Sequence, residues 1–135
     1  MGVVLPRSDP LANRGQVRLE TLADRSWVLF QPGHGLTEVI TAACRQAGFQ
    51  PSPAARTTQV QAAIALAAVG VGPAMVPDNV LAPWVEAAVC HLDPPIFREL
   101  AAYTRGEWTP LSAAFLDALR GLEWLRAPSS RALLM

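Results

Sequence analysis

The sequence predicts an α/β domain, because segments typical of buried strands alternate with segments typical of helices along the middle of the chain. The strand-like segments are short, compact apolar runs. The helix-like segments repeat apolar residues at helical spacing, and glycine or proline separates the two kinds. Alternation of this kind is typical of βαβ units, so a parallel sheet is expected.

The composition is that of one folded domain. The chain has 135 residues, of which 51% are hydrophobic and 16% are charged, which excludes a disordered solvating protein. A chain of this length buries about two-thirds of its unfolded surface. The formal net charge is zero, and the basic residues are scattered arginines. We therefore expect no tight DNA binding by this chain alone.

No segment predicts export or membrane insertion. The apolar run at residues 1–5 is too short for a signal peptide and meets Pro6 at once. The longest apolar run, Ala62–Val76, falls short of the roughly 20 residues of a membrane helix. Glycines and a proline also interrupt it. A soluble, cytoplasmic protein without membrane contact is expected.

The first half of the chain predicts strands at Val3–Leu5, Trp27–Phe30 and Ala54–Thr57. Leu19–Ala23 is expected to form a short helical turn. A loop at residues 31–35 feeds a helix, and Gly48 stands where a left-handed C-terminal cap belongs. The face that this helix should bury consists of Leu36, Val39, Ile40, Ala43, Cys44 and Ala47.

The stretch Thr58–Pro77 predicts an apolar helix, a glycine break and a short buried strand. Its G-x-G pattern at Gly70 and Gly72 has the wrong order for a dinucleotide site, because the helix precedes the glycines. We interpret the two glycines as a helix cap and a tight passage into the sheet.

The second half predicts a turn or irregular segment at Asp78–Glu86, then strands at Ala88–Leu92 and Phe97–Thr104. Thr109 is a good N-cap for a final helix with Pro110 in its first position. Residues 126–135 are expected to be a disordered tail. The apolar face of the final helix comprises Leu111, Phe115, Ala118, Leu122 and Leu125.

One loop could bind an anion. Gly33, His34 and Gly35 follow a strand and open a helix, whose N-terminal N–H groups attract negative charge. A dinucleotide-binding site requires a third glycine at the position of Glu38. It also requires an acidic residue roughly 20 positions later, which binds the ribose. No acidic residue occurs from Val39 to Pro77. A small carboxylate ligand needs neither feature, and an ordinary glycine turn remains an equally weighted alternative.

Other side chains offer weaker signals. His34 could donate to a ligand carboxylate or be simply solvated, and Thr57, Thr58 and Gln59 could cap the next helix or face a ligand. Cys44 and Cys90 are expected to be buried, reduced thiols. The histidines and cysteines are too dispersed for zinc, and no catalytic pattern occurs. We expect no metal, no cofactor and no enzymatic activity.

Four segments follow one another in order along the chain. They are VVLPRSDPLANRGQVRLETLADRSWVLF at 3–30, LTEVITAACRQAGFQP at 36–51, LAAVGVGPAMVP at 66–77 and VCHLDPPIFRELAAYTRGEWTPLSAAFLDALR at 89–120. Together they resemble the effector-binding domain of LysR-type transcriptional regulators, and the resemblance covers Val3 to Leu122.

The resemblance implies a periplasmic-binding-protein-like (type II) fold, with two α/β lobes and a cleft for a small effector, often a carboxylate. It implies one complete lobe plus part of the other. Residues 1–7 would be a crossover strand, 8–75 the second lobe, and 76–125 the returning strands and C-terminal helix of the first lobe. The implied effector-binding residues are Gln31, Pro32, Gly33, His34, Gly35, Leu36, Thr58, Gln59 and Val60.

The resemblance also implies what the chain would need from elsewhere. DNA binding would require the family's winged helix-turn-helix, and one cleft wall would come from the first half of the first lobe. Exposed first-lobe strands are expected to bind a second copy or a partner chain. The alternative functions are a stand-alone small-carboxylate solute-binding module and, least favoured, a small enzyme.

Overall fold

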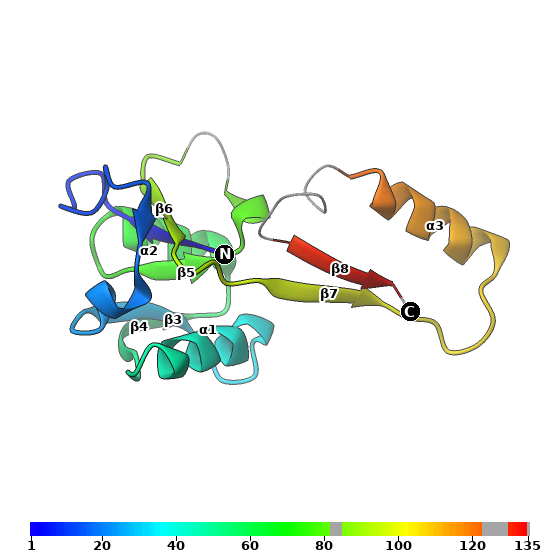
Figure 1. Cartoon of the computed structure of the whole chain (residues 1–135), viewed down its shortest axis with the longest axis horizontal. Coiled ribbons are helices and arrows are strands. Elements are labelled where there is room, and N and C mark those ends of the chain that lie inside the picture. Colours follow the sequence, from blue (N-terminus) through cyan, green and yellow to red (C-terminus); the bar gives the residue numbers. More distant parts are fainter. Residues whose placement is uncertain (82–84, 123–129, 135) are drawn as a thin grey trace. The chain divides into compact units, whose positions relative to one another are not determined.

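The computed structural model describes residues 1–81, 85–122 and 130–134 (Figure 1). The chain divides into two compact units, Met1–Ile96 and Phe97–Met135. The first unit contains β1 (Gly2–Leu5), β2 (Gln16–Val17), η1 (Leu19–Leu22), β3 (Ser26–Phe30), α1 (Gly35–Gln46), β4 (Ser52–Thr57), α2 (Val60–Ala68), β5 (Ala74–Val76), η2 (Asp78–Val80) and β6 (Ala88–Leu92).

The sheet of the first unit is mixed rather than parallel. Four strands pair in the order β2-β6-β1-β5, in which β1 is antiparallel to both of its neighbours and β2 is parallel to β6. The predicted parallel arrangement holds for β3 and β4, which form a separate parallel pair. A fully buried strand is an apolar run in either direction, so the local sequence pattern could not show that β1 is antiparallel to its neighbours.

A backbone hydrogen bond joins the two sheets. The N–H of Val28 in β3 donates to the carbonyl of Pro73, just before β5, at 3.0 Å. Beside it, a Cβ built on Gly72 would lie 2.1 Å from the carbonyl oxygen of Ser26. Gly70 has a φ of 88° and follows α2, so it is the left-handed cap that the sequence predicts. Both glycines therefore have the structural roles expected of them.

The core lies between these strands and the two helices. All four residues from Trp27 to Phe30 are buried, so both faces of β3 are covered. The indole N–H of Trp27 donates to the carbonyl of Leu22 at 3.3 Å, and its ring centroid lies 6.2 Å from that of Phe49. The helices contribute the buried residues Leu36, Ile40, Ala43 and Cys44 from α1, and Ala63, Ile64 and Ala67 from α2.

Cys44 and Cys90 are both buried and unbridged, as the sequence predicts. Burial raises the pKa of the Cys44 thiol to about 11, so its reactive thiolate form is scarce at neutral pH.

An ion pair ties the loop between β1 and β2 to Arg25, which lies just before β3. Arg25 contacts Asp9 through both terminal guanidinium nitrogens, and Leu11 donates its backbone N–H to the same carboxylate at 2.9 Å. The hydrogen bond from Arg25 is the main cause that lowers the pKa of Asp9, while burial opposes it. Only 8% of the Asp9 side chain is exposed, so water screens this pair less than a surface pair.

We expect Asp9→Asn to lower the free energy of unfolding by about 1–3 kcal/mol at pH 7, because one charged hydrogen-bond acceptor is lost. The folded-state pKa of Asp9 lies below its unfolded value. The stabilisation is therefore complete above the unfolded pKa and disappears as the pH falls through the folded pKa. Urea unfolding at pH 7 and at pH 3, at constant ionic strength, measures this. The exposed Asp24→Asn variant is the control, and equal losses for Asp9→Asn at both pH values would contradict the expectation.

The second unit contains β7 (Arg98–Ala102), α3 (Pro110–Arg120) and β8 (Ser130–Leu134). The side chain of Thr109 accepts from the N–H of Ser112 at 3.2 Å, so the predicted N-cap is confirmed. The helix ends at Arg120 with Gly121 as its C-cap, and Leu125, the last residue of the predicted apolar face, lies outside the described residues.

The tail differs from the sequence prediction. Residues 126–129 and 135 lie outside the described residues, whereas Ser130–Leu134 form β8, which pairs in parallel with β7. Backbone pairing with β7, rather than local strand propensity, makes this segment a strand, so the predicted disordered tail is corrected there.

The boundary between the units also differs from the predicted lobe boundary after residue 75. That position lies inside β5, which pairs with β1, and β6 pairs with β1 on its other side. Backbone pairing therefore keeps residues 76–92 with the first unit, which extends to Ile96.

Candidate functional site

The two predicted site segments leave the sheet at the same edge. Phe30 and Thr57, the last residues of β3 and β4, are partners in the parallel register. The N–H of Gln31 donates to the carbonyl of Thr57 at 3.0 Å. The segments Gln31–Leu36 and Thr58–Val60 therefore start side by side. Ligands of α/β proteins commonly bind beyond the carboxyl ends of parallel strands.

The first segment is a tight turn into α1. The N–H of His34 and the hydroxyl of Thr37 both donate to the carbonyl of Gln31, at 3.1 and 2.9 Å. Gly33, which lies between Gln31 and His34, has a φ of 86°. Leu36 points into the core, while Gln31, Pro32, Gly33 and Gly35 are exposed. The exposed backbone of this turn is open to a ligand.

His34 has a structural role that the sequence did not reveal. It is the N-cap of α1, because its Nδ1 accepts from the N–H of Leu36 at 3.2 Å. Its ring stacks on Phe30 with centroids 4.4 Å apart and planes 13° apart. With Nδ1 as an acceptor, the neutral ring carries its proton on Nε2 and can donate from there.

The second segment begins α2 without a side-chain cap. Thr57 Oγ1 accepts from the N–H of Gln59 at 3.1 Å, which fixes the turn ahead of the helix. Gln59 is the N-cap residue, but its side chain makes no capping hydrogen bond. The predicted capping of α2 by these polar residues is therefore not found, because Thr57 fixes only the turn ahead of the helix. Thr58 and Gln59 are exposed and Val60 is half-buried, so the first turn of α2 presents N–H groups to the surface.

We expect His34→Ala to lower the free energy of unfolding by about 1–2 kcal/mol, because it loses both the cap and the ring contact. His34→Asn should cost less, since asparagine is a good N-cap and only the stacking on Phe30 is lost. Thr58→Ala is the exposed control. Urea unfolding followed by circular dichroism measures the three values, and equal losses for His34→Ala and His34→Asn would exclude a capping contribution.

Arg56 lies beside these segments and was missed by the sequence prediction. Its Nη1 donates to the carbonyl of Phe30 at 2.9 Å, across the β3–β4 pair. No local sequence pattern marks it, because its hydrogen-bond partner Phe30 is distant in the sequence.

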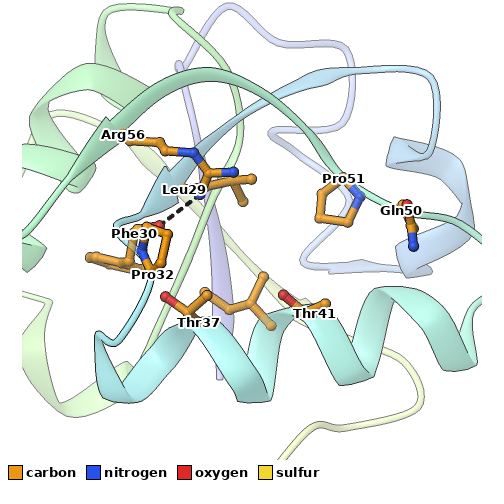
Figure 2. A pocket seen from close by; sticks show the side chains of 9 residues that line it. Leu29, Phe30, Pro32, Thr37, Thr41, Gln50, Pro51 and Arg56 are labelled. Atoms are coloured by element: carbon orange, nitrogen blue, oxygen red, sulfur yellow. Dashed lines mark hydrogen bonds between the residues drawn. The ribbon is translucent and has the colours of Figure 1, made fainter.

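Below Arg56, a cavity of about 280 Å³ opens between α1, β3 and β4, and we call it the α1–β4 pocket (Figure 2). Of the predicted site residues only Pro32 lines it. The cavity is therefore largely separate from the segments predicted to bind the effector. It is lined by Leu29, Phe30, Pro32, Thr37, Ile40, Thr41, Gln50, Pro51 and Arg56.

Neither a metal-binding cluster nor a membrane-spanning helix occurs among the described residues. No three histidine, cysteine, aspartate or glutamate side chains among them gather closely enough to hold a metal ion. Within the same residues, no helix has the length and apolar character needed to cross a membrane.

Comparison with known proteins places the sequence beside one family. The family described as "LysR substrate binding domain" matches residues 1–123. The curated regulator named HTH-type transcriptional regulator BudR, from Raoultella terrigena, is 29% identical over 133 residues. The alignment covers 97% of this chain and 40% of that protein.

Solved structures agree with this family. The C-terminal domain of a probable LysR family regulator from Rhodococcus sp. RHA1 matches with a TM-score of 0.70 and 25% identity, over 89% of this chain and 62% of that one. The effector-binding domain of QuiR in complex with shikimate matches with a TM-score of 0.70 and 23% identity, over 88% and 59%. The chain thus spans less than two-thirds of the length of each of these proteins, and it has the fold of their effector-binding domains.

Proposed function

The chain belongs to the LysR substrate-binding domain family, and on that premise we propose that it is the effector-sensing part of a LysR-type transcriptional regulator. One observation carries the proposal. The hydrogen bond from Gln31 to Thr57 aligns the starts of two helices at the carboxyl ends of two parallel strands. An effector held there would contact both α1 and α2 at once.

The proposed effector site consists of two segments, Gln31–Leu36 and Thr58–Val60. Exposed backbone N–H groups of the turn and of the first turn of α2 would bind the effector, together with the Nε2 of His34. Thr58 and Gln59 would contribute a hydroxyl and an amide. We propose no catalytic residue, because these groups can orient a ligand but offer no nucleophile activated by a base.

We propose that the effector is a small organic carboxylate. The N-terminal ends of α1 and α2 each carry partial positive charge. Neither site segment contains an acidic residue that would repel an anion. The ligand of the similar QuiR domain, shikimate, is itself a cyclic carboxylic acid.

Regulation would need parts of the protein beyond the proposed effector site. Unit 1, Met1–Ile96, would be one lobe of the effector domain, and unit 2 would belong to the other lobe. DNA would be bound by a winged helix-turn-helix domain outside this sequence. The whole regulator would work in the cytoplasm.

We propose that unit 2 associates with a second copy or with a partner chain. Tyr103, Leu111 and Phe115 are 81%, 83% and 61% exposed. In the described part of the chain, β7 and β8 pair only with each other, and a two-stranded sheet is marginally stable by itself. The double variant Leu111→Ser/Phe115→Ser should therefore sediment as a smaller species than the unmodified chain. Equal sedimentation at high concentration would oppose the proposal.

A charge variant tests the effector site. Amide chemical shifts of the full chain would be followed while shikimate and benzoate are added separately. The proposal expects shifts centred on residues 31–36 and 58–60 for at least one ligand. Gln59→Glu places a negative charge at the start of α2, where it suits the helix but repels a carboxylate.

The expected loss of affinity for Gln59→Glu is about tenfold, the factor that corresponds to 1.4 kcal/mol. Gln16→Glu, an exposed change of the same charge on β2, should bind as the unmodified chain does. If the Gln59→Glu variant and the unmodified chain bind shikimate and benzoate with equal affinity, the proposed site is wrong.

A further inference from the structure

The α1–β4 pocket combines one arginine and two threonines with apolar residues. We propose that it is a second binding site, for a small monocarboxylate with an apolar body, separate from the effector site at the ends of β3 and β4. The two sites share only Pro32. The pocket faces the flank of α1 that carries Thr37 and Thr41, whereas the effector site lies at the N-terminal ends of α1 and α2 (Figure 2).

Arg56 supplies the charge in the pocket. One of its terminal nitrogens donates to the carbonyl of Phe30 at 2.9 Å, which holds the guanidinium over the end of β3. A guanidinium has five N–H donors, so most of them remain for a ligand. Within the described residues, Arg56 forms no ion pair with a carboxylate. A held but unpaired arginine suits a carboxylate, which it can bind through two parallel hydrogen bonds.

The opposite wall supplies hydroxyl groups. Thr37 and Thr41 are one helical turn apart on α1, and Figure 2 shows both rising from the helix toward the strand that carries Arg56. The hydroxyl of Thr37 already donates to Gln31 and can still accept. Thr41 makes no side-chain hydrogen bond within the described residues, so its hydroxyl is available to a ligand. The amide of Gln50 adds a further donor at the other end.

The floor of the pocket is apolar. Leu29, Phe30 and Ile40 line it, and their exposed fractions are 7%, 1% and 2%. The proline rings of Pro32 and Pro51 add rigid walls that have no N–H to satisfy. A ring or short alkyl chain can therefore lie on the floor while its carboxylate meets Arg56.

The size and charge of the pocket narrow the ligand class. Its volume of about 280 Å³ lies just below the range of roughly 300–1,000 Å³ for drug-sized ligands, so the ligand must be small. No aspartate or glutamate lines the pocket, and Arg56 is its single formal charge. One carboxylate is neutralised there, whereas a second one would remain unpaired against apolar walls.

The test uses the full chain, with benzoate as the probe and benzamide as its uncharged analogue. Binding would be followed by amide chemical shifts. The proposal expects benzoate to shift the amides of residues 37, 41, 50 and 56, and expects benzamide to bind at least tenfold more weakly. Arg56→Gln should weaken benzoate binding at this site at least tenfold. Thr41→Val, which keeps the side-chain shape, should weaken it severalfold without altering the fold.

The matched control is Arg45→Gln, which removes an exposed arginine of α1 that does not line the pocket and should leave affinity unchanged. Equal affinity in Arg56→Gln, Thr41→Val and the unmodified chain would overturn the proposal. Shifts confined to residues 31–36 and 58–60 would also overturn it, while they would favour the effector site. Conversely, Gln59→Glu should leave benzoate binding in the α1–β4 pocket intact, so either site can fail without the other.

Discussion

Gly72→Ala should lower the free energy of unfolding by about 3 kcal/mol or more, at the upper end of the range for overpacked sites. The added Cβ would lie 2.1 Å from the carbonyl oxygen of Ser26, and the next nearest atoms also belong to the backbone. No side-chain rotation can relieve that clash, so β3 and the segment before β5 must move apart. The move would also stretch the adjacent hydrogen bond between Val28 and Pro73.

Gly35→Ala is the matched control for this prediction. It adds the same methyl group at the first residue of α1, where nothing lies within 4 Å of the built Cβ. Alanine favours the helix there, so stability should be unchanged or slightly raised. Urea unfolding of both variants gives the comparison. A loss below about 1 kcal/mol for Gly72→Ala would contradict the prediction, because it would mean that the backbones at Gly72 and Ser26 can move apart at little cost.

Trp27→Ala should lower the free energy of unfolding by about 3–5 kcal/mol, the usual cost of truncating a large buried aromatic side chain. Trp27 is fully buried, packs against Phe49 and donates its indole N–H to Leu22. Removing the ring leaves a cavity under η1 and removes one of the two hydrogen bonds that the Leu22 carbonyl accepts, the other coming from the N–H of Arg25. Trp27→Phe should cost less, because it retains most of the packing and loses only the hydrogen bond and part of the volume.

Trp108→Ala is the control, because Trp108 is 39% exposed and lies in the second unit. It should change stability by about 0.5 kcal/mol or less, as exposed positions usually do. Guanidinium unfolding followed by circular dichroism measures all three tryptophan variants. Comparable losses for Trp27→Ala and Trp108→Ala would contradict the placement of Trp27 at the centre of the core.

Much of the local structure could be predicted because it depends on neighbouring residues. The glycine that ends α2 and the threonine that begins α3 are set by positions within a few residues of each, and the structure agrees at both. Helical spacing likewise identified the buried face of α1. Its four buried residues, Leu36, Ile40, Ala43 and Cys44, all belong to the predicted face.

The features that the sequence did not predict depend on distant residues. The strand β2 has two residues and exists because it pairs with β6, which lies far along the chain. The antiparallel direction of β1 is set by its pairing with β5 on one side and β6 on the other, and both strands lie far along the chain. No local pattern encodes either one.

The candidate site shows the same division. The family resemblance indicated both loop segments, and the register of Phe30 with Thr57 explains why they start together. The resemblance did not indicate Arg56. This residue became a candidate because it donates to the carbonyl of Phe30 across the strand pair and lines a pocket together with the hydroxyls of α1. Those relations appear only once the strands are paired.

The hydrogen bond from Val28 to Pro73 has a consequence for signalling within the first unit. The proposed ligand contacts lie at one end of the β3–β4 pair, and this bond ties the same pair to the four-stranded sheet. Any sliding of the pair on ligand binding would strain that link. The exchange rate of the Val28 amide proton with solvent deuterium is therefore a single-residue gauge of mechanical coupling between the ligand loops and the sheet.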